Sequence, residues 1–208
     1  MSKTADDQSL ILNAAKACYL RLGVAKTTAA DIASEAGISR ATLYRRFPSH
    51  EDIFVRVLAR DSMDMVQDSN ARLGNITDPG ERIIEGMLFC LDEIPRRPLH
   101  AHLLQESGAI TLAMPAETLH AIALGMLSDL LHVSPAVADQ GIDDFAELLL
   151  RILASYAMVP SHRARNRDEM RRFLHNMLDP IIASVLAGHG TDAKNKKTKG
   201  NKRGGKPT

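Results

Sequence analysis

Apolar side chains recur at intervals of three and four residues along nearly the whole chain. This spacing places them on one face of a helix, whereas strands show a period of two. No segment of useful length alternates with that shorter period. The pattern therefore predicts an all-α protein.

Turn and capping residues divide the first third of the chain into four expected helices. Gly23 stops the first, and Pro48 stops the third because the residue before a proline disfavours the helical conformation. Ser49 begins the fourth, in a run that resembles a capping box. The expected spans are 8–22, 28–36, 39–47 and 49–73.

The second and third helices are joined so closely that they predict a helix-turn-helix. Gly37 permits the left-handed backbone of a tight turn. Thr28, with Asp31, can cap the second helix, and Ser39 can cap the third. Leu43 and Phe47 lie four residues apart and face the core, so the third helix displays the side chains of Arg40, Ala41, Tyr44 and Arg45.

Proline-containing breaks divide the rest of the chain into helices of ordinary length. They fall at residues 78–80, 94–98, 114–115, 134–135 and 159–161. The last two expected helices are the most apolar, with stripes over residues 142–156 and 170–186. Each stripe is wide enough to cover an internal core and a second surface, as in a helical dimer. Packing within a monomer is the alternative.

Composition narrows the class of protein. The chain has 208 residues, of which 45% are hydrophobic and 25% are charged, which is enough for globular cores. Its apolar stretches are too short to cross a bilayer, and it begins without the pattern of a secretory signal. We therefore expect a cytoplasmic protein in which Cys18 and Cys90 are buried free thiols.

The formal net charge of +1 conceals a strong segregation of charge. Residues 1–50 carry +3, residues 51–190 carry −8 and residues 191–208 carry +6. A basic N-terminal segment beside an acidic middle segment suggests that the N-terminal segment faces a polyanion. Beyond residue 188 the lysine-rich composition predicts a basic disordered tail over 189–208, which either adds non-specific phosphate contacts or serves only as a solubilising end.

The helix-turn-helix region resembles the DNA-binding domain of the tetracycline-repressor (TetR) family. The resemblance covers about a quarter of the chain. It rests on the segments Asp31-Ile32-Ala33, Ala36-Gly37-Ile38-Ser39, Thr42-Leu43-Tyr44, Phe47-Pro48-Ser49 and Glu51-Asp52-Ile53-Phe54. It implies an N-terminal three-helix DNA-binding domain over 1–49, followed by a helical effector-binding and dimerisation domain over 50–188.

The resemblance also implies how DNA is held. The third helix would begin in the major groove of a palindromic double-stranded operator, with side chains on bases and on the phosphates around them. Arginine is the usual reader of guanine, so we expect Arg40 first and Arg45 second to select bases. A common family pattern has Lys where this chain has His50. The implied DNA contacts are Thr27, Thr28, Ser39, Arg40, Ala41, Thr42, Tyr44, Arg45 and His50.

In the resemblance, the last two helices pack against those of a second copy, and the helices before them enclose an effector. Methionines suit an adaptable apolar wall, so the effector is expected to be small and apolar. Histidine spacing argues against a metal site, no cofactor motif is present, and no catalytic constellation points to an enzyme. The expected pocket residues are Met87, Cys90, Leu91, Leu103, Leu104, His120, Met126 and Tyr156.

The sequence thus predicts a transcriptional regulator, a homodimeric repressor released from its operator by a small apolar effector. Two alternatives come from other classes of protein. One is a protein-interaction adaptor that uses the same helices. The other is a small-molecule-binding protein that keeps a vestigial helix-turn-helix.

Overall fold

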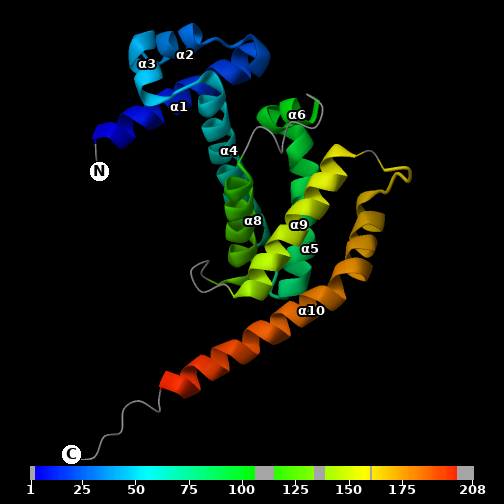
Figure 1. Cartoon of the computed structure of the whole chain (residues 1–208). Coiled ribbons are helices and arrows are strands. Elements are labelled where there is room, and N and C mark those ends of the chain that lie inside the picture. Colours follow the sequence, from blue (N-terminus) through cyan, green and yellow to red (C-terminus); the bar gives the residue numbers. More distant parts are fainter. Residues whose placement is uncertain (1–2, 106–114, 134–138, 160, 201–208) are drawn as a thin grey trace, which may run out of the picture. The chain divides into compact units, whose positions relative to one another are not determined.

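The computed structural model describes residues 3–105, 115–133, 139–159 and 161–200. Every regular element in these ranges is a helix, so the all-α prediction is confirmed (Figure 1). The elements are α1 (Lys3–Leu22), η1 (Val24–Lys26), α2 (Ala29–Glu35), α3 (Arg40–Arg46), α4 (His50–Leu73), α5 (Pro79–Glu93), η2 (Ile94–Arg96), α6 (Pro98–Gln105), α8 (Ala116–Leu131), α9 (Gln140–Met158) and α10 (Arg167–Gly200).

The first four helices end within a residue or two of where the sequence predicts. Two boundaries differ at the start of a helix: α1 already begins at Lys3, and α5 begins at Pro79 itself. Proline fits the first turn of a helix because the N–H that it lacks has no partner there. The predicted break at 134–135 and residue 114 of the break before it lie outside the described residues.

The chain forms two compact units. Unit one comprises residues 1–68 and 90–122, and unit two comprises residues 69–89 and 123–208. These units group residues by proximity. They do not test the functional division that the sequence predicts at residue 49, which stays a prediction.

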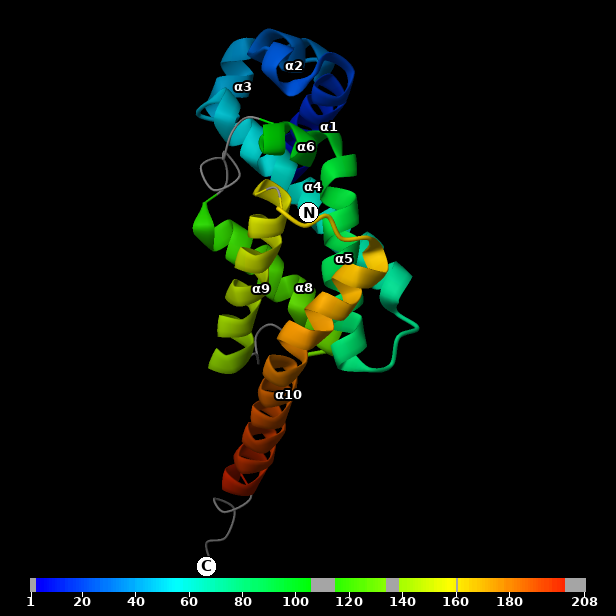
Figure 2. The same ribbon diagram turned by 90° about the vertical axis from the view of Figure 1, so that its right-hand side faces the viewer.

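The core of unit one joins α1, α2, α3 and the first half of α4. Ile32, Leu43 and Phe47 are fully buried in it, which confirms the inward face predicted for α3. Cys18 is also buried as a free thiol, as expected. Figure 2 shows α1, α2 and α3 grouped together from a second side.

The core of unit two joins α5, α8, α9 and α10. Ile84, Ile142 and Leu174 lie in it with almost no exposed surface. Helices α5 and α8 approach closely at Gly86, where a Cβ atom would lie only 2.9 Å from Cδ1 of Leu130. A side chain at residue 86 would therefore displace Leu130, which explains a glycine inside this helix.

The last helix extends past the predicted start of the basic tail. Its backbone is helical as far as Gly200, whereas the composition predicts disorder from residue 189. The helix also contains Pro180, which does not end it. The end of the helix and the change in composition therefore fall at different residues.

Candidate nucleic-acid interface

A tight turn sets the angle between α2 and α3. Gly37 has a φ of 66°, in the left-handed region where a side chain would be strained. The N–H of Gly37 donates to the carbonyl of Ser34 at 3.1 Å, and the N–H of Ile38 donates to the carbonyl of Ala33 at 2.9 Å. The backbone hydrogen bonds of the turn are thus satisfied as the sequence predicts.

Both short helices are capped by the predicted residues. The N–H of Asp31 donates to Oγ1 of Thr28 at 3.2 Å, and the N–H of Thr28 donates to Oδ2 of Asp31 at 2.8 Å, which completes a capping box. At α3, the N–H of Thr42 donates to Oγ of Ser39 at 3.1 Å. The hydrogen bonds from Thr28 lower the pKa of Asp31 below its ordinary value.

The start of α3 presents a cationic and polar surface to solvent. Arg40, Ala41, Tyr44 and Arg45 are all exposed, as predicted. Neither Arg40 nor Arg45 has an ion pair with any carboxylate in the described part of the chain. The structure therefore places two unneutralised guanidinium groups on one short helix that is anchored from below by Leu43 and Phe47.

The neighbouring Arg46, unlike Arg40 and Arg45, forms an ion pair with a described residue. Its Nη2 lies 3.0 Å from Oδ2 of Asp7 on α1. Nη2 of Arg21, also on α1, lies 2.9 Å from Oε2 of Glu35 at the end of α2. These two ion pairs tie both helices of the motif to α1, so Arg46 has a structural partner that Arg40 and Arg45 lack.

Two of the implied DNA contacts are placed differently from the others. Thr27 is buried, and its hydroxyl donates to the carbonyl of Gly23 at 2.8 Å. Its contact with a phosphate stays a prediction. His50 is half-buried at the start of α4, where its Nε2 lies 3.4 Å from the hydroxyl of Tyr19. Thr28 and Ser39 are exposed, and Thr42 is half-buried.

This geometry agrees with a comparison to known protein families. Residues 11–57 match the family model described as bacterial regulatory proteins of the tetR family. Over these residues the chain is similar to the DNA-binding domain of that family. The match spans α2 and α3 with parts of α1 and α4, so the TetR helix-turn-helix coincides with the exposed arginines.

Proteins similar to this chain include two from Mycobacterium tuberculosis. One uncharacterised HTH-type transcriptional regulator is 26% identical over 187 residues, which is 86% of this chain and 89% of that protein. Another of the same description is 39% identical over 64 residues, 31% of this chain and 34% of that protein. The second relative is thus more similar in sequence, but over a much shorter segment.

Two solved structures share the fold. A TetR transcriptional regulator from Rhodococcus sp. RHA1 is 16% identical, with 86% of this chain and 98% of that chain covered and a TM-score of 0.56. RolR, solved in complex with resorcinol, is also 16% identical, with 78% and 98% covered and a TM-score of 0.50. At these identities the likeness concerns the fold alone.

A buried polar cluster in unit one was missed by sequence reasoning. Nζ of Lys16 on α1 lies 2.8 Å from Oδ1 of Asp61 on α4, and Nδ1 of His100 on α6 lies 3.2 Å from Oδ2 of the same carboxylate. Oγ of Ser62 and Nε2 of His100 are 3.0 Å apart. Three helices thus share one carboxylate.

Arg97 extends this cluster. Its Nη1 donates to the backbone carbonyl of Asp61 at 3.2 Å, and its Nη2 pairs with Asp68. Burial disfavours the charged form of Asp61, but hydrogen bonds from His100 and Lys16 outweigh it and hold the pKa of this carboxyl well below its usual range. Asp61 is therefore an ionised group inside the unit.

A signal for the cluster was present in the sequence. Asp61 and Ser62 follow Leu58 by three and four residues and precede Met65 by four and three, so they lie on the buried face of α4. Polar residues at core positions are expected to have buried partners. The pattern could have identified Asp61, but not Lys16 or His100 as its partners.

The expected effector-pocket residues are divided between the two units. Cys90, Leu91 and His120 belong to unit one, whereas Met87, Met126 and Tyr156 belong to unit two. Cys90 is a buried cysteine outside any disulfide, and burial raises the pKa of its thiol to about 12. The side chains of Leu103 and Leu104 lie outside the described residues. The pocket itself stays a prediction, and two small cavities described in unit two are lined by other residues.

Two further findings concern metal sites and membrane-spanning helices. Within the described ranges, His, Cys, Asp and Glu side chains form no group of three or more that could hold a metal ion. Among the described helices, none combines the length and the apolar character required to cross a membrane.

Proposed function

We propose that this TetR-family regulator is a cytoplasmic homodimeric repressor that reads a palindromic operator through α3. The observation that carries the proposal is the exposed pair Arg40 and Arg45, both without carboxylate partners in the described part of the chain. A free guanidinium can donate two hydrogen bonds to the edge of a guanine, which discriminates against other bases by roughly 1–3 kcal/mol. Tyr44, 44% exposed on the same helix, would contact a phosphate.

Dimerisation follows from how little one short helix can read. The seven residues of α3 reach only a few base pairs, and two copies spaced by about one helical turn of DNA double the contacts. Helices α9 and α10 supply a candidate interface. Leu148 on α9 and Met177 and Ile181 on α10 are large apolar side chains exposed by 37%, 55% and 37%. A second copy would remove them from water.

Release would follow a shift between two populations. An effector that favours the released state would move α4 and change the distance between the two recognition helices. The shared carboxylate of Asp61 supports this route because it joins α4 to α1 through Lys16 and to α6 through His100. A hundredfold preference for the released state corresponds to about 2.7 kcal/mol.

We propose a small apolar effector for the reason found in the sequence, the adaptable methionines among the expected pocket residues. RolR, which shares the fold, was solved with resorcinol, a small molecule. We further infer a regulatory rather than an enzymatic role, in keeping with a family of bacterial regulatory proteins.

The proposal is tested by incubating the purified chain with sheared fragments of its source genome and sequencing the retained DNA. We expect one palindromic motif, with half-sites about 10 base pairs apart or a multiple of that spacing. The variant Arg40→Ala with Tyr44→Phe should lose this motif. Retention of all fragments alike, or the same motif with the double variant, would overturn the assignment of α3. A partner protein would then be the next explanation to examine.

A further inference from the structure

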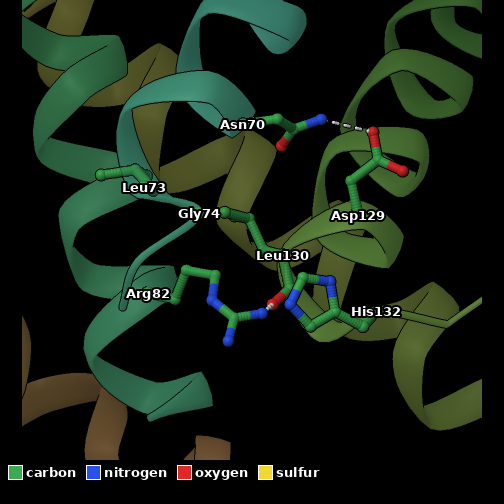
Figure 3. A pocket seen from close by; sticks show the side chains of 7 residues that line it. All are labelled: Asn70, Leu73, Gly74, Arg82, Asp129, Leu130 and His132. Carbon is green, nitrogen blue, oxygen red and sulfur yellow. Dashed lines mark hydrogen bonds between the residues drawn. The ribbon is translucent and has the colours of Figure 1, made fainter. Parts of the chain in front are cut away.

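A cavity of about 200 Å³ with charged side chains at its wall lies within unit two. It is formed where α4 ends, α5 begins and α8 ends. Its volume is below the roughly 300–1,000 Å³ typical of sites for drug-sized ligands. At about 30 Å³ for each water molecule, it holds on the order of seven waters or one small metabolite. The lining residues are Asn70, Leu73, Gly74, Arg82, Asp129, Leu130 and His132 (Figure 3).

Arg82 places a buried positive charge beside the cavity. The residue is only 5% exposed. Its Nε donates to the carbonyl of Ile76 at 2.8 Å, its Nη1 to that of Leu130 at 2.6 Å, and its Nη2 to that of Thr77 at 3.3 Å. These acceptors are neutral, and they use three of the five N–H groups of a guanidinium. No carboxylate in the described residues pairs with Arg82.

Asp129 contributes the opposite charge to the same cavity. Its Oδ2 accepts a hydrogen bond from Nδ2 of Asn70 at 2.7 Å, and no cationic side chain of the described chain pairs with it. Figure 3 shows Asn70 and Asp129 facing each other at one end of the cavity, with Arg82 and His132 at the other. One small cavity therefore holds a cation and an anion that are not paired with each other.

His132 lies at the cavity in an unusual backbone conformation. It follows the last residue of α8 with a φ of 56°, and among the described residues it is the one non-glycine with positive φ. Glycine or asparagine is the common choice at this position because other side chains are strained there. The exposed imidazole of His132 adds a further polar group beside Arg82.

We propose that this cavity binds a small zwitterion of amino-acid size, with its carboxylate toward Arg82 and its ammonium toward Asp129. A buried cation whose acceptors are all neutral gains a partner from an anionic ligand group, in surroundings where charges are weakly screened. The carboxylate of Asp129 selects a positive group at the other end. This site differs from the expected apolar effector pocket in its residues and in its two charged side chains, and the inference does not rest on DNA binding.

The test is calorimetric titration of the purified full-length chain with each of the twenty standard α-amino acids at pH 7. We expect at least one to bind with a Kd below about 1 mM, the weak end of specific affinities. For that amino acid, the corresponding amine without the carboxylate and the corresponding acid without the ammonium should each bind at least about tenfold more weakly. This pattern requires both charges of the cavity.

Two substitutions link the binding to the cavity. Asp129→Asn removes the charge of an exposed residue and should weaken binding at least about tenfold. Asp144→Asn is the matched control. Asp144 on α9 is also exposed, and it also accepts a hydrogen bond from a side-chain amide, Nε2 of Gln140 at 2.8 Å. Arg82→Gln should also abolish binding, with thermal unfolding recorded to establish that the variant is folded.

Three results would overturn the inference. If none of the twenty amino acids binds at about 10 mM, above the millimolar range of weak ligands, the cavity holds water and Arg82 serves only to tie the loop after α4 to the end of α8. If the acid without the ammonium binds equally well, the ligand is a simple anion. Unchanged affinity in Asp129→Asn would place the binding elsewhere.

Discussion

Oδ1 of Asp61 lies 2.8 Å from Nζ of Lys16, so a buried carboxylate on α4 pairs with α1, the first helix of the DNA-binding part. The second oxygen faces His100 on α6. Because the carboxylate is buried, losing it leaves Nδ1 of His100 without its anionic partner and leaves the Lys16 ammonium with the exposed Asp64 alone. Such a loss is more costly than the loss of an exposed ion pair.

We therefore expect Asp61→Asn to lower the free energy of unfolding by about 3 kcal/mol, the lower end for breaking a buried pair. Asp64→Asn is the matched control, because Asp64 contacts the same Nζ of Lys16 at 3.1 Å with a side chain 55% exposed. An exposed pair contributes about 0–1 kcal/mol. Urea unfolding at pH 7 measures both variants, and equal losses would contradict the importance of the buried carboxylate.

The stability that Asp61 contributes should also depend on pH. Its pKa in the folded protein is lowered by His100 and Lys16 despite burial, so the unfolded state binds a proton more readily than the folded state. The contribution is then complete above the unfolded pKa of about 3.9 and declines as the pH falls below it. The stability difference between the natural chain and Asp61→Asn should shrink in urea titrations as the pH falls from about 5 to about 3. A constant difference would show that Asp61 does not titrate in this way.

The parts of the fold that the sequence predicts well are those set by local rules. The capping residues Thr28 and Ser39, the turn at Gly37 and the inward face of α3 follow from backbone and side-chain chemistry within a few residues. The ion pair of Arg46 with Asp7 on α1, and the hydrogen bond of the Thr27 hydroxyl to the carbonyl of Gly23, depend on residues outside α3. Spacing along α3 alone could not reveal them, because the partners are distant in sequence or belong to another turn.

Polar contacts between residues that are distant in sequence are not predicted by the helical pattern. Asp61 occupies a core position of α4 that the periodicity exposes, yet its partner His100 is 39 residues away. The cavity beside Arg82 likewise depends on the ends of three helices meeting in unit two. Helical periodicity specifies which face is buried, but it does not specify which polar residues of different helices meet.

Two glycines should respond in opposite ways to the same substitution. Gly37→Ala is expected to destabilise the protein by about 1–2 kcal/mol, because its φ of 66° is strained for a residue with a Cβ. Gly125→Ala, inside α8, should stabilise it by about 0.5–1 kcal/mol because alanine favours the helix. A Cβ at either position meets no atom within 4 Å, so steric crowding contributes to neither change in stability. Thermal unfolding of both variants measures the effect, and the same sign for both would contradict the backbone explanation.

If the proposed dimer interface is correct, charged substitutions on α10 should separate the dimer into monomers. Met177→Glu together with Ile181→Glu places two charges on the exposed face of α10 and should convert a dimer of 22.7 kDa chains into monomers. Met63→Glu is the control, since Met63 on α4 is 59% exposed against 55% for Met177. Light scattering after size exclusion reports the mass directly. A natural chain that is already monomeric, or a double variant that stays dimeric, would rule out this interface.

The central claim is that α3 reads DNA through Arg40. Its most direct test is the affinity of Arg40→Ala and Arg46→Ala for the recovered operator and for a scrambled duplex, measured by fluorescence anisotropy. Both variants lose one positive charge from the same helix, but Arg46 is paired with Asp7 whereas Arg40 has no carboxylate partner among the described residues. We predict that Arg40→Ala weakens operator binding by roughly tenfold or more, from the loss of 1–3 kcal/mol of base discrimination, and that Arg46→Ala keeps its preference for the operator. Equal losses in the two variants, or an operator preference that survives Arg40→Ala, would contradict the account.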